Sequence, residues 1–466
     1  MMNAKPQARL KALVAACLLA SALTSAQAAS PQTGVQERDV RAEMYFLAGD
    51  AMQGRGSGTL FERIAAEYIG SQFMQFGLEP AGDVDTVGRA SFVQTVPVLG
   101  KKVVDSFEAQ GALAKQMDWK RNVVAFRMAD THVQGKLQKL KAGEAAEKDA
   151  VVLLSVAEDA QFNDVFAEFR KLTRAGTRTV IVPANKQIRD NWATLAERDV
   201  EAGEQGNLLF VDEALGQHLS SLKDGSEIAF DTMFKKQADT STWNAIGKIT
   251  GSDPKLAAQT IVLSAHLDHL GVSTKETDTD RINNGADDDA SGSVAVMELA
   301  RALAAGKKPK RTIYFVCFGS EEAGGYGSRH FLQTLPFPKE NFVANLQFEM
   351  IGRPDDKVAA QTLWLTGYDR SNLGAELAKR GARLVADPHP EENFFQRSDN
   401  YTFARQGVVA HTVSSYGLHK DYHHASDENG KIDFAHMTRS IDSMIKPVRW
   451  LAGSDFVPAW VEGKKP

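Results

Sequence analysis

Cysteine is almost absent from this chain, because only Cys17 and Cys317 occur among its 466 residues. That count excludes a disulfide scaffold and a cysteine-rich zinc module. Neither sign of charge dominates, since the formal net charge is −5 with 24% charged residues, so no nucleic-acid partner is indicated. Hydrophobic residues make up 43% of the chain, which excludes a disordered or collagen-like protein. The length corresponds to about two to three domains.

Long hydrophobic runs are also scarce, and the run Ala12–Leu23 is too short to span a bilayer as an ordinary helix. Basic residues precede this run and small residues follow it, which predicts a secretory signal peptide over residues 1–28. We therefore expect an exported protein, periplasmic or secreted, without stable membrane insertion. The stretch Val14–Cys17 resembles a lipobox, so a lipoprotein anchored through Cys17 is the alternative, although much of the apolar run lies beyond that cysteine.

The middle of the chain differs in composition from the two ends. Before it, apolar residues at three- and four-residue spacing indicate helix between Val40 and Gly77. Residues 98–240 are rich in lysine and glutamate and contain one predicted helix, Phe162–Leu172, but no cluster of histidine, cysteine or paired acids. We interpret this segment as a separate module without catalytic residues. Its predicted strands are Asn122–Phe126, Ala150–Val156, Thr179–Val182 and Asn207–Val211.

From Trp243 onward, apolar strands alternate with amphipathic helices, which predicts an α/β fold: a mixed, largely parallel β-sheet with helices on both faces. In such sheets, ligand chemistry collects in loops at the strand ends. Strands are predicted at Ala245–Ile249, Thr260–Ala265, Thr312–Phe318, Ala344–Phe348, Leu363–Thr366 and Val408–Val413. Helices are predicted at Ser291–Ala305, Ser371–Arg383 and Phe434–Leu451.

Polar side chains that can bind metals stand just after several of these runs. His266 ends one strand, and Asp268 lies on the same side of an extended chain, where its carboxylate could orient the imidazole ring. A histidine at a strand end can equally be a structural residue. The triplet Asp287–Asp289 precedes a helix, and three consecutive acids repel one another unless a cation compensates them. The alternative is a solvated loop whose acids favour the helix amino terminus.

Three further groups have the same character. Glu321 and Glu322 follow a very apolar strand, where adjacent carboxylates are costly without a cation, unless they form a surface turn. One of them can bind metal while the other remains free as a base. Glu349 interrupts an apolar run, either as a ligand or as an acid paired with a base such as Arg353. The fifth group is Tyr422-His423. Two histidines and three carboxylates are too many ligands for one tetrahedral zinc, but they suit two metals that share a carboxylate.

These motifs, in this order, resemble the exported co-catalytic dizinc aminopeptidases of peptidase clan MH, the bacterial leucyl-type enzymes with a protease-associated insert. The similarity extends to the Gly54-Arg55-Gly56 loop, to Gly77-Leu78-Glu79-Pro80, to Trp243-Asn244-Ala245-Ile246-Gly247 and to Arg397-Ser398-Asp399. It covers nearly all of the chain outside residues 98–240. That segment resembles the mostly-β protease-associated insert only loosely.

The resemblance implies a role for each group. His266 and Glu349 bind one zinc ion, His423 and Glu322 bind the other, and Asp288 bridges them. Glu349 departs from the pattern, since many members have aspartate there.

The resemblance also implies the other catalytic roles. Glu321 is the general base, Asp268 orients a ligand, and Tyr422 donates to the developing oxyanion. No role is implied for the remaining polar residues, which we interpret as loop or supporting residues: Asp287, Asp289, His269 and His424.

The implied function is hydrolysis of N-terminal residues from peptides with a free amino terminus, by a hydroxide shared between two Zn²⁺ per chain. A carboxypeptidase, a dipeptidase or a glutaminyl cyclase on the same scaffold, or an inactive binding protein like the transferrin receptor ectodomain, are the alternatives. Residues 29–97 and 241–466 are then the two parts of the catalytic domain, and residues 98–240 are the insert. The sequence does not predict the side-chain preference, the physiological metal, the role of the insert or the oligomeric state.

Overall fold

The computed structural model describes residues 33–275 and 279–466, in two compact units. Unit 1 comprises Met1–Pro97 and Ser241–Pro466, and unit 2 comprises Val98–Thr240. The predicted signal peptide, residues 1–28, lies outside the described residues. Among the described residues, none of the helices has both the length and the apolar character needed to cross a membrane.

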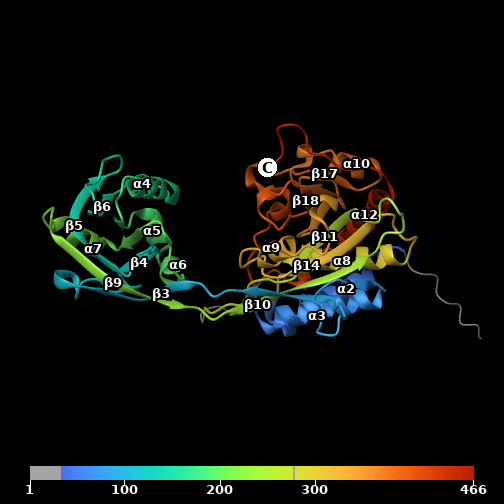
Figure 1. The fold of residues 1–466 in the computed structure, drawn as a ribbon, viewed down its shortest axis with the longest axis horizontal. Helices are drawn as coiled ribbons and strands as arrows, with labels where there is room; N and C mark the ends of the chain where they lie inside the picture. Colours follow the sequence, from blue (N-terminus) through green and yellow to red (C-terminus); the bar gives the residue numbers. More distant parts are fainter. Residues whose placement is uncertain (1–32, 276–278) are drawn as a thin grey trace, which may run out of the picture. The chain divides into compact units, whose positions relative to one another are not determined.

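Unit 1 is built on a nine-stranded sheet in the order β1-β10-β14-β11-β15-β18-β16-β17, with β2 also paired to β10 (Figure 1). The four central strands β14, β11, β15 and β18 run parallel, whereas β10 and β16 pair antiparallel to β14 and β18. The strands are β1 (Glu79–Pro80), β2 (Val93–Val98), β10 (Thr240–Ile249), β11 (Thr260–His266), β14 (Thr312–Phe318), β15 (Phe342–Phe348), β16 (Leu363–Leu365), β17 (Leu384–Ala386) and β18 (Val409–Ser414). A short hairpin pairs β12 (Gly271–Val272) with β13 (Ile282–Asn283).

Helices cover both faces of this sheet, because successive side chains of its strands alternate between two cores. Ile261 and Leu263 of β11 pack in the core formed with α2, α3, α8 and α12, whereas Val262 packs in the core formed with α9 and α11. The predicted mixed, largely parallel sheet with helices on both faces is therefore confirmed. The helices are α2 (Glu37–Leu47), α3 (Leu60–Gln75), α8 (Gly292–Ala304), α9 (Tyr326–Gln333), α10 (Leu373–Lys379), α11 (Asn400–Ala404) and α12 (Phe434–Gly453).

Unit 2 has its own seven-stranded sheet, ordered β3-β9-β5-β6-β7-β8-β4, in which β5 to β8 run parallel. Parallel neighbours need crossover connections, and helices supply them, so this unit contains more helix than the mostly-β module that the sequence predicts. Its strands are β3 (Lys102–Ala109), β4 (Val123–Arg127), β5 (His132–Lys141), β6 (Val151–Ser155), β7 (Thr179–Pro183), β8 (Asn207–Val211) and β9 (Glu227–Lys236). Its helices are α4 (Phe162–Arg174), α5 (Lys186–Asp190), α6 (Trp192–Glu197) and α7 (Glu213–Ser221).

The parallel centre of unit 1 determines where polar loops meet. Strands β11, β14, β15 and β18 place their carboxyl ends at one edge of the sheet, and each is followed by one of the polar groups that the sequence singles out. A short helical segment, η3 (Ala286–Ser291), brings the acidic triplet to the amino terminus of α8. Five loops far apart in sequence therefore converge.

Candidate metal centre

One group of donor atoms forms where β11, η3 and β15 meet. Nε2 of His266 lies 3.1 Å from Oδ1 of Asp288, and donor atoms of His266, Asp288 and Glu349 all lie within 4.8 Å of one another. The ring of His266 is 1% exposed, and its Nδ1 lies 3.1 Å from the backbone carbonyl oxygen of Asp268. This hydrogen bond places the ring proton on Nδ1 and leaves Nε2 facing the carboxylates. We name this cluster group A.

Glu349 is not paired with Arg353, the base that the alternative interpretation proposed for it. Arg353 donates instead to Asp421, with an Nη1–Oδ2 distance of 2.8 Å. The Oε2 atom of Glu349 is buried without a hydrogen-bond partner, and burial raises the pKa of this carboxyl to about 7. The structure therefore places Glu349 in group A as a buried acid with one unpartnered carboxylate oxygen.

The other oxygen of Asp288 faces a second group of donor atoms. Nε2 of His423 lies 3.2 Å from Oδ2 of Asp288 and 3.2 Å from Oε1 of Glu322. His269, for which the sequence implies no role, also lies here, with Nδ1 3.0 Å from Oε1 of Glu322. We name the cluster of His269, Asp288, Glu322 and His423 group B. Asp288 thus presents one oxygen to each group, the arrangement that a bridging carboxylate needs.

The imidazoles and carboxylates of the two groups shift each other's pKa values. Although burial acts in the opposite direction, contacts with His266 and His423 hold the pKa of Asp288 well below its usual range. Burial likewise opposes it, but the carboxylates of Asp288 and Glu322 raise the pKa of His423 to about 10. Protons on the imidazoles therefore balance the carboxylates, and a divalent cation would compete with those protons. Histidine nitrogens and carboxylate oxygens at these separations fit zinc.

Glu321 belongs to neither group, although its neighbour Glu322 belongs to group B. Its backbone N–H donates to Oδ1 of Asp268 at 3.0 Å, and the N–H of Glu322 donates to Oδ2 of Asp268 at 3.3 Å. Burial, reinforced by the carboxylate of Glu349, raises the pKa of Glu321 well above its usual range. The Oδ1 atom of Asp268 lies 3.6 Å from Nδ1 of His266, which is farther than its 3.0 Å hydrogen bond with the backbone N–H of Glu321. Asp268 therefore holds the backbone of the Glu321 loop more directly than it contacts the His266 ring.

Buried charged residues hold the loops beneath the two groups, and of these only Asp289 was interpreted from the sequence as a loop or supporting residue. Arg55 is fully buried and donates to the backbone carbonyls of Leu267, Asn284 and Gly285 at 2.8, 2.7 and 2.9 Å. It therefore joins the loop after β11 to the loop before η3. The only sequence signal was a charged residue between the glycines Gly54 and Gly56 of a motif.

Three acids do the same for the other loops. Asp289 accepts from the N–H groups of His266, Gly292 and Met350, at 3.1, 3.0 and 3.0 Å. Asp427 accepts from the N–H groups of Asp287 and Asp288.

Glu62 is the third of these acids. It accepts from the N–H of Ser320 at 2.8 Å and from the hydroxyl of Thr242 at 2.5 Å. Because these acids bind backbone amides, they position the metal-binding side chains without facing them.

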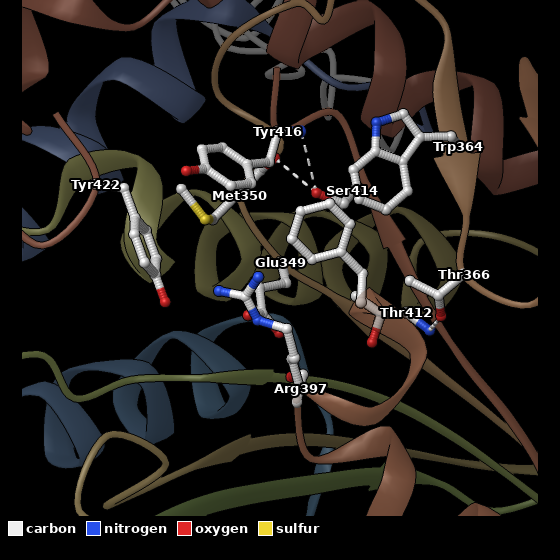
Figure 2. A pocket seen from close by; sticks show the side chains of 11 residues that line it. Glu349, Met350, Trp364, Thr366, Arg397, Thr412, Ser414, Tyr416 and Tyr422 are labelled. Carbon is white, nitrogen blue, oxygen red and sulfur yellow. Dashed lines mark hydrogen bonds between the residues drawn. The ribbon is translucent and has the colours of Figure 1, made fainter. Parts of the chain in front are cut away.

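A pocket opens beside group A, with Glu349 and Tyr422 in its wall (Figure 2). The ring of Tyr422 stacks on His423, with ring centroids 3.9 Å apart. Arg397 also lines the pocket, and its guanidinium lies 4.9 Å from the ring centroid of Phe394. The remaining lining is apolar or hydroxyl-bearing: Met350, Trp364, Phe394, Tyr416, Thr366, Ser398, Thr412 and Ser414.

Comparison with curated proteins gives partial matches. A probable zinc metalloprotease of Pyrenophora teres f. teres (strain 0-1) is 28% identical over 206 residues, covering 43% of this chain and 39% of that protein. An aminopeptidase of Pseudomonas aeruginosa (strain UCBPP-PA14) is 33% identical over 129 residues, covering 28% of this chain and 21% of that protein. The chain thus spans about two fifths or less of the length of these two relatives.

Comparison with solved structures extends over most of the chain. An aminopeptidase from Aneurinibacillus sp. strain AM-1 matches with a TM-score of 0.58 and 18% identity, covering 91% of this chain and 95% of that one. A zinc aminopeptidase from Bacillus subtilis matches with a TM-score of 0.54 and 18% identity, covering 91% and 97%. These likenesses show that the chain has the fold of those proteins.

A family model matches the part of the chain that contains both donor groups. The matched residues are 244–447, and the family is Peptidase family M28. Every residue of groups A and B falls within that range. Both donor groups therefore lie in the segment that is similar to Peptidase family M28.

Proposed function

We propose that this chain is a dizinc aminopeptidase that removes N-terminal residues from peptides. The observation that supports the proposal is the placement of Asp288, whose two carboxylate oxygens face different donor groups, 3.1 Å from His266 and 3.2 Å from His423. Group A then holds one zinc ion and group B the other. The matched family and the printed names of the relatives, zinc metalloprotease and aminopeptidase, support the same class of activity.

Two bound cations would lower the pKa of a water molecule between them and polarise the scissile carbonyl. The protein supplies the proton transfers. Glu321 is free of both donor groups, so it takes a proton from the attacking water and returns it to the leaving amine. Tyr422, in the wall of the pocket beside Glu349, donates a hydrogen bond to the oxygen on which negative charge develops.

The surroundings of the site favour a substrate with a free amino terminus and an apolar first side chain. Glu321, Glu349 and Asp399 place carboxyl groups around group A, and these groups can accept hydrogen bonds from a substrate ammonium group. The adjoining pocket has apolar walls in Met350 and Trp364, which suit an aliphatic or aromatic side chain.

A panel of aminoacyl chromogenic substrates, each with a free and an acetylated amine, tests this function with and without a chelator. We expect release from the free-amine substrates only, strongest for apolar residues and lost on chelation. Glu321→Gln is the matched variant, in which release should fall by at least about a hundredfold. Equal cleavage of acetylated substrates, release from the carboxyl end, or cyclisation of glutaminyl substrates would contradict the proposal in favour of another enzyme class. Absence of bound metal would favour a binding protein.

A further inference from the structure

Four buried polar atoms around His269 have no hydrogen-bond partner. They are Nδ1 of His269, Nε2 of His423, Oδ2 of Asp288 and Oε1 of Glu322. Buried polar atoms without partners are rare in folded proteins, and each costs free energy. Four such atoms from four separate loops lie close together, so one missing partner would satisfy all of them.

The donor atoms of His269, Asp288 and Glu322 all lie within 4.8 Å of one another, as ligands around a single ion do, and His423 faces the same two carboxylates. Nδ1 of His269 lies 3.0 Å from the Glu322 oxygen and 3.8 Å from the Asp288 oxygen. Nε2 of His423 lies 3.2 Å from each of the same two oxygens. Ligands about 2.0–2.1 Å from a tetrahedral zinc lie roughly 3.4 Å apart. The measured distances scatter around that value, whereas a structural histidine would satisfy its ring nitrogens with hydrogen bonds.

His269 is also held firmly in this position. Its side chain is fully buried, and its backbone N–H donates to the carbonyl of Arg55 at 3.2 Å. Its other ring nitrogen, Nε2, has no partner either, so nothing else in the described residues accounts for an imidazole here. Although Nδ1 of His269 lies 3.0 Å from Oε1 of Glu322, the two atoms do not form a hydrogen bond, and Nδ1 has no partner.

We propose that His269 is a direct ligand of the cation in group B, so that four protein atoms hold this cation and three hold the cation in group A. The inference rests on the two-cation site of the proposed function and adds a residue to it. A site with four protein ligands is nearly closed, as in structural zinc sites, whereas three ligands leave a position open to water or substrate. Group B should therefore bind its cation more tightly, and the cation of group A should be the exchangeable one.

Zinc titration of the full chain and of His269→Ala tests the ligand, with His424→Ala as the matched control. His424 is an exposed histidine of the same loop as His423 and belongs to neither donor group. We expect two zinc ions in the wild type and in His424→Ala. In His269→Ala, the tighter of the two affinities should fall by at least tenfold, since even residues that only support a ligand are worth about 10–100-fold. Cobalt substitution should show a changed visible spectrum in His269→Ala alone.

X-ray absorption of zinc in the wild type provides a measurement that does not depend on a variant folding. With one equivalent of zinc, the proposal expects two imidazoles around the metal, and with two equivalents it expects three imidazoles shared between two ions. One imidazole per zinc in the wild type, or unchanged affinities and cobalt spectrum in a folded His269→Ala, would overturn the role of His269 and leave the proposed function intact. A wild-type chain that binds no zinc would overturn both.

Discussion

At the scale of single residues, substitution of Glu321 should affect proton transfer without affecting metal binding. Glu321→Gln keeps the size and shape of the side chain, but its amide group cannot accept a proton as a carboxylate does. Because general acid–base catalysis typically contributes about 10²–10⁴-fold, kcat should fall by at least about a hundredfold. Zinc content, measured on the same preparation, should stay at the wild-type value because Glu321 belongs to neither donor group. Wild-type turnover in a fully metallated variant would contradict the role of Glu321 as the base.

Glu349 is the residue whose replacement should remove one metal and leave the other. Its Oε2 atom is buried and unpartnered in group A, while group B does not include it. Glu349→Ala should lose the cation associated with His266 and keep the one associated with His423. Glu349→Asp, one methylene shorter, should weaken that cation less, provided that the loop after β15 adjusts. Zinc analysis after dialysis against a weak chelator measures both, and two retained zinc ions in folded Glu349→Ala would rule out the assignment.

The burial of His411 should make the free energy of unfolding depend on pH in the acidic range, independently of metal binding. This buried imidazole lies 2.7 Å from both the Thr366 carbonyl oxygen and the Ser371 hydroxyl oxygen, and burial lowers its pKa to about 4. The unfolded chain takes up a proton near pH 6.5, whereas the folded chain does so only near pH 4. The titration of His411 therefore leaves the free energy of unfolding unchanged above pH 6.5. It lowers that free energy by roughly 3 kcal/mol as the pH falls to 4.

Urea unfolding in EDTA at several pH values measures this effect. His411→Gln should remove the part of the pH dependence between pH 6.5 and 4, whatever it does to stability at pH 7. His424→Gln, at an exposed position, is the control and should keep the wild-type slope. An unchanged slope in His411→Gln would show that another group titrates.

At the scale of elements, the most consequential connection is the one between the segment η1 (Asp50–Arg55) and the loops of the metal centre. The guanidinium of Arg55 donates to backbone carbonyls on both sides of group A, and burial lowers its pKa to about 10. Arg55→Met keeps much of the volume but leaves those carbonyls without donors. We expect a loss of about 3–5 kcal/mol in unfolding free energy together with weaker zinc binding.

The control for that substitution is Arg63→Met on α3. The side chain of Arg63 is 55% exposed and lies 3.8 Å from Glu67, an arrangement worth about 0.5 kcal/mol. Denaturant unfolding in EDTA and zinc affinity would be measured on both variants. Similar small effects in the two would mean that the loops hold their positions without Arg55.

Elements with a strong hydrophobic pattern could be predicted from the sequence, and this is why the loops of the site were located. The predicted strand Thr312–Phe318 is β14 itself, and the predicted helix Phe434–Leu451 differs from α12 only at its end. Short elements such as α9 and α11 were missed, because five to eight residues do not establish a helical period. The parallel order β14-β11-β15-β18 also required tertiary information.

Residues whose function depends on long-range contacts could not be predicted in the same way. His269 was interpreted from the sequence only as a loop or supporting residue, because its proximity to Glu322 is created by pairing β11 beside β14. Arg55 is 212 residues from Leu267, to whose carbonyl it donates. By contrast, His266 and Glu349 follow predicted strands and Asp288 precedes a predicted helix, so the pattern of elements brought these residues into consideration. Their assignment as zinc ligands stays a prediction until metal is measured.

At the scale of the whole molecule, each unit has its own hydrophobic core. Unit 1 buries apolar residues of its nine-stranded sheet against α8 and α12, while unit 2 buries residues such as Leu153 and Ile181 of its separate sheet. All of the candidate metal ligands lie in unit 1. The carboxylates of both donor groups repel one another without a cation, so metal binding should stabilise the unit that contains them.

Hydrogen exchange followed by mass spectrometry resolves this expectation along the chain. A ligand that binds only the folded form stabilises it by RT ln(1 + [L]/Kd), about 2.7 kcal/mol at a hundredfold excess over Kd. Zinc added to chelator-treated protein should therefore slow exchange in peptides from β11, η3, α8 and the loop after β18. Peptides from Val98–Thr240 are the internal control and should exchange at the same rate in both samples, because that unit contributes no ligand. If zinc slowed hydrogen exchange equally in both units, residues 98–240 would respond to the metal centre. The proposed activity would then have to be studied with both units present.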